Sequence, residues 1–173
     1  MTLVLQEHWT WVSIYLVLDS MGINDLIPTG NADGDFIKSQ HKFAHYYVGY
    51  GYFGTLNEIA ITEMYKVLTL NSRTVTLTGR AVELPLPVAL NRYWNWISCP
   101  SQHPQSLQVA LRNATFTADD VIKSQTLFAR YYSGHGWYGL LQVLSPGDGY
   151  ELYVHTDPRL TFTDDINTLS RGG

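Results

Sequence analysis

This 173-residue sequence has few charged residues, a single cysteine and no long apolar run. Charged side chains make up 15% of the chain, against roughly 25% in an average globular domain. The net charge of -4 offers no basic surface for a phosphate backbone, which argues against nucleic-acid binding. The single Cys99 excludes an intrachain disulfide framework and a cysteine-rich zinc site. The most apolar stretch, Val12 to Leu18, covers seven residues, far fewer than the roughly 20 of a membrane-spanning helix.

Aromatic residues are abundant where charge is scarce. They make up 13% of the chain, a composition that excludes disorder, since disordered chains combine high charge with few aromatic rings. A length of 173 residues is enough for one domain or two small ones with a real core. Met1 is followed by neither a basic segment nor a long apolar one, so no signal peptide is predicted.

The chain contains an internal duplication. His8-Trp9-Thr10-Trp11-Val12-Ser13 matches Tyr93-Trp94-Asn95-Trp96-Ile97-Ser98, and Ile37-Lys38-Ser39-Gln40 recurs as Ile122-Lys123-Ser124-Gln125. Both matches have an offset of 85 residues, and about 20 identical positions share that offset without a gap. Such self-similarity is typical of repeated structural units. We therefore expect two homologous repeats, residues 1–85 and 86–173, the second ending in a polar tail at about 163–173.

The duplication separates residues that the fold requires from residues that serve a single site. Aromatic rings recur at the offset, whereas none of the six histidines does. We therefore predict that the recurring rings form the core of each repeat. This predicted core comprises Trp9, Trp11, Phe43, Tyr47, Trp94, Trp96, Phe128 and Tyr132. Cys99 aligns with Ile14, which predicts a small buried apolar side chain.

Short segments rich in aromatic and β-branched residues alternate with Gly, Asn and Pro, as in antiparallel sheets. Strands are predicted at Trp9 to Ser13, Phe43 to Tyr47, Tyr52 to Leu56, Tyr65 to Leu70 and Thr74 to Thr78, and at their counterparts 85 residues later. Short helices are predicted at Met21 to Ile27 and at Ser106 to Leu111, the second with Ser106 as N-cap. Gly79 to Leu90 is expected to join the repeats as an edge strand. The predicted fold is mainly β: two homologous antiparallel β lobes, with one short helix each, related by a pseudo-two-fold axis.

Glycines occur in a G-x-G-x-x-G pattern in both repeats. In a nucleotide-binding fold this pattern cradles a pyrophosphate at a helix N-terminus. Here the following residues do not open a helix, and bulky aromatic residues fill the positions where a phosphate would approach the backbone. We predict instead a turn between two aromatic strands, in which glycine adopts positive φ. The predicted turn glycines are Gly49, Gly51, Gly54, Gly134, Gly136 and Gly139.

No motif predicts catalysis, a cofactor or a metal ion. His41 and His45 would lie roughly 13 Å apart on an extended chain, too far apart to share an ion. Asp35 and Asp120 both precede the Ile-Lys-Ser-Gln block by two residues, as expected of turn aspartates that accept bonds from local backbone N–H groups. No Ser/His/Asp or Cys/His set recurs, and no carboxylate pair lies in an apolar setting. We therefore predict that the protein is not an enzyme.

The order of motifs resembles a tandem module found in large secreted surface proteins of bacteria. In repeat 2 the resemblance rests on Trp94 to Ser98, Asp120 to Tyr132, Gly134 to Leu141 and Pro146 to Tyr150. Repeat 1 departs from it where Glu63-Met64-Tyr65 replaces the Gly-x-Gly-Tyr turn. A free-standing chain of two repeats is also similar in architecture to the shell proteins that tile the pyrenoid of diatoms and related algae. That similarity implies a chloroplast protein, with its transit peptide removed, that assembles into a sheet around the Rubisco matrix.

Two functional hypotheses follow, and the first is self-assembly. In a chain with little charge, aromatic residues that the core does not need can be buried between chains, and two similar but unequal faces can propagate a sheet or tube. The candidate contact residues are Tyr15, Tyr50, Tyr93, Tyr153 and Phe116, with Ile166 and Leu169 from the tail. Other shell or matrix proteins are possible partners.

The alternative hypothesis is a carbohydrate- or partner-binding module of a secreted surface protein, extracellular or at the cell surface. Tryptophan and tyrosine rings on a β surface can stack on sugar rings. The two hypotheses differ in where the recurring tryptophans lie. Buried rings would belong to the core, whereas an exposed flat platform would favour glycan binding.

Overall fold

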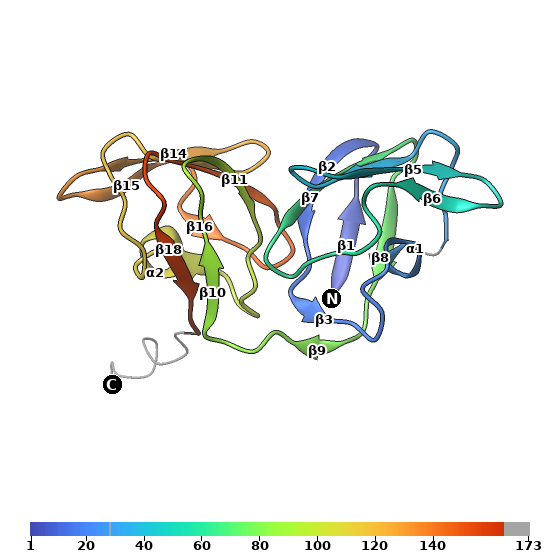
Figure 1. The fold of residues 1–173 in the computed structure, drawn as a ribbon, viewed down its shortest axis with the longest axis horizontal. Helices are drawn as coiled ribbons and strands as arrows, with labels where there is room; N and C mark the ends of the chain where they lie inside the picture. Colours follow the sequence, from blue (N-terminus) through green and yellow to red (C-terminus); the bar gives the residue numbers. More distant parts are fainter. Residues whose placement is uncertain (28, 165–173) are drawn as a thin grey trace.

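The computed structural model describes residues 1–27 and 29–164, and these form two antiparallel β lobes side by side (Figure 1). We call residues 1–81 lobe 1 and residues 86–164 lobe 2. Each lobe is built on a five-stranded antiparallel sheet, and the mainly β class predicted from the sequence is confirmed. No helix in the described ranges is long and apolar enough to span a membrane.

Lobe 1 contains nine strands and one four-residue helix. They are β1 (Thr2–Leu5), β2 (His8–Ser13), β3 (Leu16–Val17), α1 (Ile23–Leu26), β4 (Phe36–Lys38), β5 (Phe43–Tyr47), β6 (Gly51–Gly54), β7 (Met64–Thr69), β8 (Arg73–Thr76) and β9 (Arg80–Ala81). The large sheet has the order β2-β7-β4-β5-β6, and β1 pairs with β8 and β3 with β9 in separate ribbons.

Lobe 2 repeats the large sheet and one of the two ribbons of lobe 1. It contains β10 (Leu86–Ala89), β11 (Tyr93–Ile97), β12 (Gln105–Ser106), α2 (Leu107–Ala110), β13 (Val121–Lys123), β14 (Phe128–Tyr132), β15 (Gly136–Gly139), β16 (Val143–Leu144), β17 (Tyr150–Val154) and β18 (Arg159–Phe162). Its large sheet has the order β11-β17-β13-β14-β15, which matches lobe 1 strand for strand, and β10-β18 corresponds to β1-β8.

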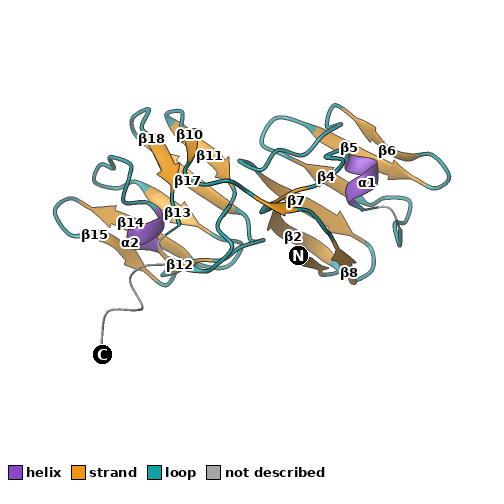
Figure 2. Ribbon diagram, turned by 90° about the horizontal axis from the view of Figure 1, so that it is seen from below, coloured by secondary structure: helices purple, strands orange, loops and turns teal. Residues whose placement is uncertain are grey.

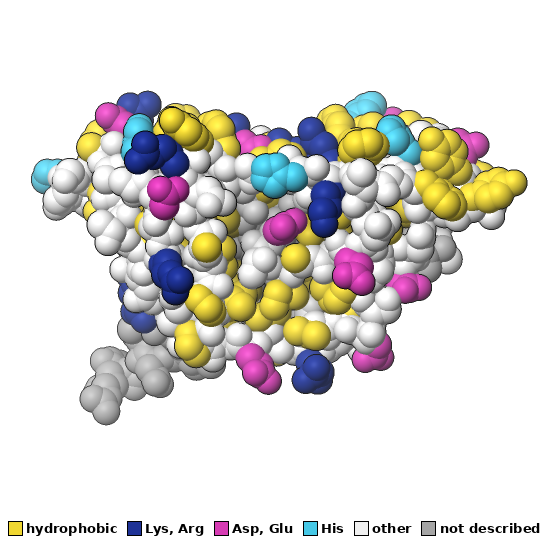
Figure 3. Space-filling model, viewed as in Figure 1, with side chains coloured by type: hydrophobic (Ala, Val, Ile, Leu, Met, Phe, Trp, Pro, Cys, Tyr) yellow, Lys and Arg dark blue, Asp and Glu magenta, His cyan; other side chains and the backbone are white. Residues whose placement is uncertain are grey.

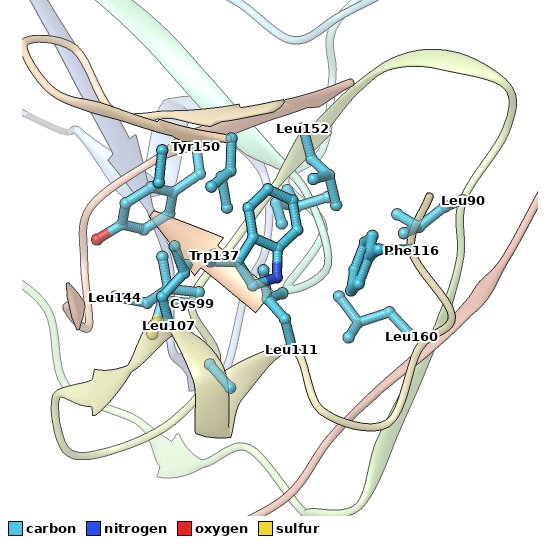
Figure 4. Close-up of a cluster of buried hydrophobic side chains, with 14 of the residues drawn as sticks. Leu90, Cys99, Leu107, Leu111, Phe116, Trp137, Leu144, Tyr150, Leu152 and Leu160 are labelled. Atoms are coloured by element: carbon cyan, nitrogen blue, oxygen red, sulfur yellow. The ribbon is translucent and has the colours of Figure 1, made fainter. Parts of the chain in front are cut away.

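Each lobe has its own hydrophobic core, formed between the inner face of the large sheet, the β1-β8 or β10-β18 ribbon, and the short helix. In lobe 2, Trp137 from β15 lies at the centre with Phe116 on one side and Tyr150 on the other (Figure 4). The buried apolar cluster of lobe 1 uses residues 3–77 and that of lobe 2 uses residues 88–162. The burial of each large side chain contributes about 1.5–3 kcal/mol, so each lobe has a source of stability independent of the other.

The two helices flank the large sheets near opposite ends of the molecule (Figure 2). Ser106 caps α2 as predicted, its hydroxyl oxygen accepting a hydrogen bond from the backbone N–H of Val109. The corresponding N-cap of α1 is Gly22, which offers no side-chain acceptor. Both helices cover only four residues, fewer than the sequence pattern predicted.

The segment that joins the lobes is not the single edge strand expected from Gly79 to Leu90. Its first part forms β9, which pairs with β3 of lobe 1, and its last part forms β10, which pairs with β18 of lobe 2. Between them, Val82 to Pro85 cross from one lobe to the other along the lower side of the molecule in Figure 1. The prolines therefore lie at and after this crossing.

Candidate functional site

The aromatic residues predicted to form the repeat core lie mostly on the outer faces of the two sheets. Phe43, Tyr47, Phe128 and Tyr132 are exposed, which contradicts their prediction as core. The reason is the two-residue period of a strand. On β5 the small Ala44 is buried against the core, so the large rings before and after it point outward.

The tryptophans also lie outside the core. Trp9 and Trp94 are 38% and 40% exposed, and Trp11 and Trp96 are half-buried. Their prediction as core residues is therefore wrong as well. These four rings gather at the boundary between the lobes instead, where they interleave with lysine side chains.

Four tryptophans and three lysines alternate across the lobe boundary in a series that we call the Trp–Lys ladder. Its order is Trp9, Lys38, Trp96, Lys66, Trp11, Lys123 and Trp94. The closest approaches are those of Lys66 Nζ to the ring centroids of Trp11 and Trp96, at 4.1 and 4.3 Å. A cation over an indole face contributes about 0.5–2 kcal/mol, more as water is excluded. Since the rings come from both lobes, the ladder holds the lobes together.

A carboxylate joins two of the ladder lysines. Glu151 accepts from Lys66 Nζ at 2.5 Å and from Lys123 Nζ at 2.7 Å, and its side chain is largely buried. Lys66 and Glu151 occupy equivalent positions of the two repeats, 85 residues apart. Two lysines or two glutamates at these equivalent positions would repel each other. The lysine in one repeat and the glutamate in the other attract, so this sequence difference stabilises the contact between the lobes.

Hydrogen bonds across the lobe boundary are reciprocal. Gln125 of lobe 2 donates to the Trp9 carbonyl at 2.7 Å and accepts from the Trp11 N–H at 3.0 Å. Gln40 of lobe 1 makes the equivalent bonds to Trp94 and Trp96, at the same distances. This is the contact pattern that an approximate two-fold relation produces, while the axis itself stays a prediction.

The glutamines of the Ile-Lys-Ser-Gln blocks therefore have a specific role. Strands β2 and β11 are the inner edges of the two sheets, and an uncapped strand edge presents free N–H and C=O groups. Each edge is satisfied by an amide side chain from the opposite lobe.

The outer sheet edges, β6 and β15, are capped from within their own lobes. Asn24 accepts from the Tyr52 N–H at 2.6 Å and donates to its carbonyl at 3.3 Å. Gln108 does the same for Trp137. Since amide side chains occupy these backbone groups, a second chain cannot add a strand at these positions without displacing them.

The hairpins β5-β6 and β14-β15 extend to opposite ends of the long axis of the molecule (Figure 1). Figure 3 shows hydrophobic side chains gathered at the end formed by β5-β6. Four exposed apolar residues of this hairpin, which we call end A, are Tyr47, Val48, Tyr50 and Phe53, and Phe43 is exposed at the start of β5. At the opposite hairpin, end B, Tyr132, His135 and Tyr138 line a shallow groove.

The assembly candidates have different environments. Tyr50 is 79% exposed at end A, and Tyr93 is exposed. Tyr15 is half-buried, and so is Tyr153, whose ring packs 5.2 Å from that of Trp94. Phe116 is buried 4.9 Å from the Trp137 ring, so its prediction as a contact residue is wrong. Ile166 and Leu169 lie outside the described residues.

The predicted turn glycines fall into two groups. Gly49, Gly51, Gly134 and Gly136 have positive φ, as predicted. At Gly54 the reason is close packing, because a Cβ atom there would lie 2.1 Å from the carbonyl oxygen of Phe43. Gly139 combines both causes, with φ of 156° and the Phe128 carbonyl 2.3 Å from an added Cβ.

Asp35 and Asp120 occupy equivalent structural positions. Asp35 accepts from the N–H groups of Ala32 and Leu70, and Asp120 accepts from those of Thr117 and His155. Both carboxylates are fully buried. Their role thus extends beyond the predicted local turn. Asp35 links the turn before β4 to the end of β7, and Asp120 links the turn before β13 to the end of β17.

The titratable groups of the described residues form no group of three or more His, Cys, Asp or Glu side chains suited to a metal ion. Burial raises the pKa of Cys99 to about 12, so this thiol stays protonated near neutral pH, as expected for a buried apolar residue. Burial also raises the pKa of Tyr52 to about 12.

No protein-family model matches this chain, and comparisons with curated proteins and with solved structures find no match.

Proposed function

We propose that this chain is a non-enzymatic structural protein that self-assembles into a sheet or tube by contact between end A of one copy and end B of the next. The observation that carries the proposal is the presence of exposed aromatic hairpins at both ends of the long axis. Contiguous exposed apolar surface of this kind marks interaction sites. From the architectural resemblance of a two-repeat chain to pyrenoid shell proteins, we propose that the assembly surrounds the Rubisco compartment of an algal chloroplast.

The different compositions of the two ends favour a head-to-tail contact. Tyr50 at end A is largely exposed, while its counterpart at end B is His135, which lines a shallow depression with Tyr132 and Tyr138. Contact between two different surfaces of one chain does not close on itself unless the rotation between copies happens to close a ring. Capped strand edges at both hairpins favour contact through side chains over the addition of strands.

Electron microscopy of the purified protein, before and after substitution at end A, tests this proposal. We expect ordered sheets or tubes from the unmodified chain and none from the variant Tyr50→Ser/Phe53→Ser. Val4→Ser is the matched control, because Val4 is exposed in β1 away from both ends. Assembly that survives the end A substitutions, or that fails equally in the control, would contradict the proposed contact.

A second candidate function is binding of a glycan by the outer faces of the sheets. The observation in its favour is the partial exposure of Trp9 and Trp94, since exposed indole rings stack on sugars. In this case the protein would be extracellular or at a cell surface. A glycan-binding screen tests it: binding lost in Trp9→Ala and Trp94→Ala, but retained in Tyr50→Ser/Phe53→Ser, would favour this function over assembly.

A further inference from the structure

We propose that the lobe boundary also forms between two copies of this chain, lobe 1 of one copy pairing with lobe 2 of another. This lobe exchange deepens the proposed self-assembly and rests on it. Strand β2 of one copy then contacts lobe 2 of a second copy, and β11 contacts lobe 1 of that copy. Four features of the boundary support the inference.

The first feature is the independence of the two cores. Buried apolar side chains of the described residues cluster separately in lobe 1 and in lobe 2. The boundary itself consists of the Trp–Lys ladder, the Glu151 ion pairs, hydrogen bonds and the packing of Met64 against Gly149. Separating the lobes therefore uncovers Met64 but keeps each apolar cluster within its own lobe.

The second feature is self-complementarity. The Ser13 N–H donates to the Gly147 carbonyl at 2.8 Å, and the equivalent Ser98 N–H donates to the Thr62 carbonyl at 3.3 Å. Together with the reciprocal glutamine bonds, these contacts have the form of an isologous interface, in which each side presents the same surface. Homodimers commonly use such interfaces, and nothing in the contacts requires the two lobes to belong to one chain.

The third feature is that each lobe is incomplete alone. Without the opposite lobe, β2 and β11 lose the glutamine side chains that cap their backbone groups. The half-buried ring of Trp96 would also lose Lys66 of lobe 1, and that of Trp11 would lose Lys123 of lobe 2. A separated lobe therefore presents a ready site for the opposite lobe of another copy.

The fourth feature is the simple connection between the lobes. Each end of the joining segment is paired within its own lobe, β9 with β3 and β10 with β18. Exchange therefore requires a change of conformation only in residues 82–85. A short linker gives the boundary within one chain an effective concentration in the millimolar range, so exchange is favoured where copies are crowded, as in an assembled sheet.

A charge reversal tests lobe exchange directly. In Lys66→Glu the new carboxylate faces Glu151 across the boundary, and in Glu151→Lys the new ammonium group faces Lys66 and lies beside Lys123. When the two variants are mixed, exchange pairs lobe 1 of each variant with lobe 2 of the other. In both of the resulting boundaries, positions 66 and 151 then carry opposite charges. We expect a heterodimer of about twice the 19.6 kDa chain mass in native mass spectrometry, at least tenfold more abundant than either homodimer. A mixture that stays monomeric would overturn the proposal.

Both variants carry Tyr50→Ser and Phe53→Ser, which remove end A. The outcome is then independent of end-to-end contact, and failure of lobe exchange is distinguishable from failure of the proposed assembly. The matched control joins Lys66→Glu and Glu151→Lys in one chain, which restores opposite charges within that chain and should remain monomeric. Dimers formed as readily by this control would also overturn the proposal.

A second variant covers the case in which charge reversal prevents folding. Deletion of residues 83–85 shortens the connection so that the lobes of one chain should not reach their boundary. It removes Leu84 from the edge of the lobe 2 core but keeps the buried members of both clusters and all the named boundary contacts. We expect this variant to be dimeric in light scattering at micromolar concentration. A folded monomer would contradict lobe exchange.

Discussion

Replacement of Asp35 by alanine should destabilise lobe 1 strongly. Its carboxylate accepts from two backbone N–H groups at 3.0 and 3.1 Å and from Arg73 Nη2 at 2.8 Å. The Arg73 side chain is only 11% exposed, so removal of its partner leaves a guanidinium that water reaches poorly. Breaking a buried ion pair from one side costs about 3–5 kcal/mol, which we take as the expected loss in free energy of unfolding.

The equivalent change in lobe 2 should cost less. Asp120 has His155 where Asp35 has Arg73, with the Nδ1 atom 2.7 Å from the carboxylate, and the His155 side chain is 46% exposed. In Asp120→Ala water can therefore solvate the imidazole. The main loss is that of the acceptor for two backbone N–H groups, and unsatisfied buried donors cost about 1–3 kcal/mol each. Thr117 is half-buried and His155 is exposed, so each donor should cost about 1 kcal/mol, the low end of that range. With the Thr117 hydroxyl, which also loses its acceptor, we expect a loss of about 2–3 kcal/mol.

Native-state hydrogen exchange separates the two effects, because it reports on each lobe through its own amides. Asp35→Ala should lower the protection of the Val67 amide, in the core of lobe 1, more than Asp120→Ala lowers that of Leu152 in lobe 2. The control is Asp19→Ala at an exposed position, where a change within about 0.5 kcal/mol is expected. Equal losses in Asp35→Ala and Asp19→Ala, or a larger loss in Asp120→Ala, would refute this reasoning.

Four further predictions concern single residues. Gly54→Ala should lower the free energy of unfolding by about 2–3 kcal/mol in urea titrations, because the new methyl group overlaps the Phe43 carbonyl. Gly49→Ala should cost only about 1 kcal/mol, since its surroundings are open and only positive φ is strained. Cys99, whose pKa burial raises to about 12, should react with a thiol reagent on the order of 1,000-fold more slowly in the native than in the unfolded protein; equal rates would contradict its burial. Burial likewise raises the pKa of Tyr52 from 10.0 to about 12, so the unfolded chain loses this proton at a lower pH than the folded chain. The free energy of unfolding should therefore be full below pH 10 and fall between pH 10 and 12. Urea titrations at pH 9 and 11 test this, and Tyr52→Phe should show a smaller fall.

Local sequence signals predicted part of the fold, although β1, β4 and β13 were not among the predicted strands. The strand predicted at Phe43 to Tyr47 is β5 with the same limits, and Ser106 is the N-cap of α2. Positive φ at Gly51 follows from its place in a tight turn. These features depend on neighbouring residues, whose effects can be read from the sequence directly.

The faces of the strands could not be read in the same way. On β5 aromatic or small apolar residues occupy both faces, so alternation does not reveal which face meets the core. Ala44 is buried and Phe43 exposed, the reverse of the order that hydrophobicity alone suggests. Gly54 was a signal of which face meets the core. The backbone of Ala44 lies so close to Gly54 that no residue larger than glycine fits at position 54.

The lobe boundary depends on contacts between residues far apart in the chain. Gln125 recurs with its block at an offset of 85 residues, which correctly marked the block as structural. Its bonds go to Trp9 and Trp11, 116 and 114 residues away. No local pattern encodes such a pairing. The duplication indicates only that Gln40 and Gln125 should make equivalent contacts, each with the opposite repeat.

Sedimentation velocity of the unmodified protein over a concentration series, at low and high salt, addresses self-assembly most directly. Contact between apolar ends predicts species larger than the 19.6 kDa chain that grow with concentration and persist at high salt, because salt screens charges but not apolar contacts. A single monomeric species at every concentration and salt condition would contradict the proposed function.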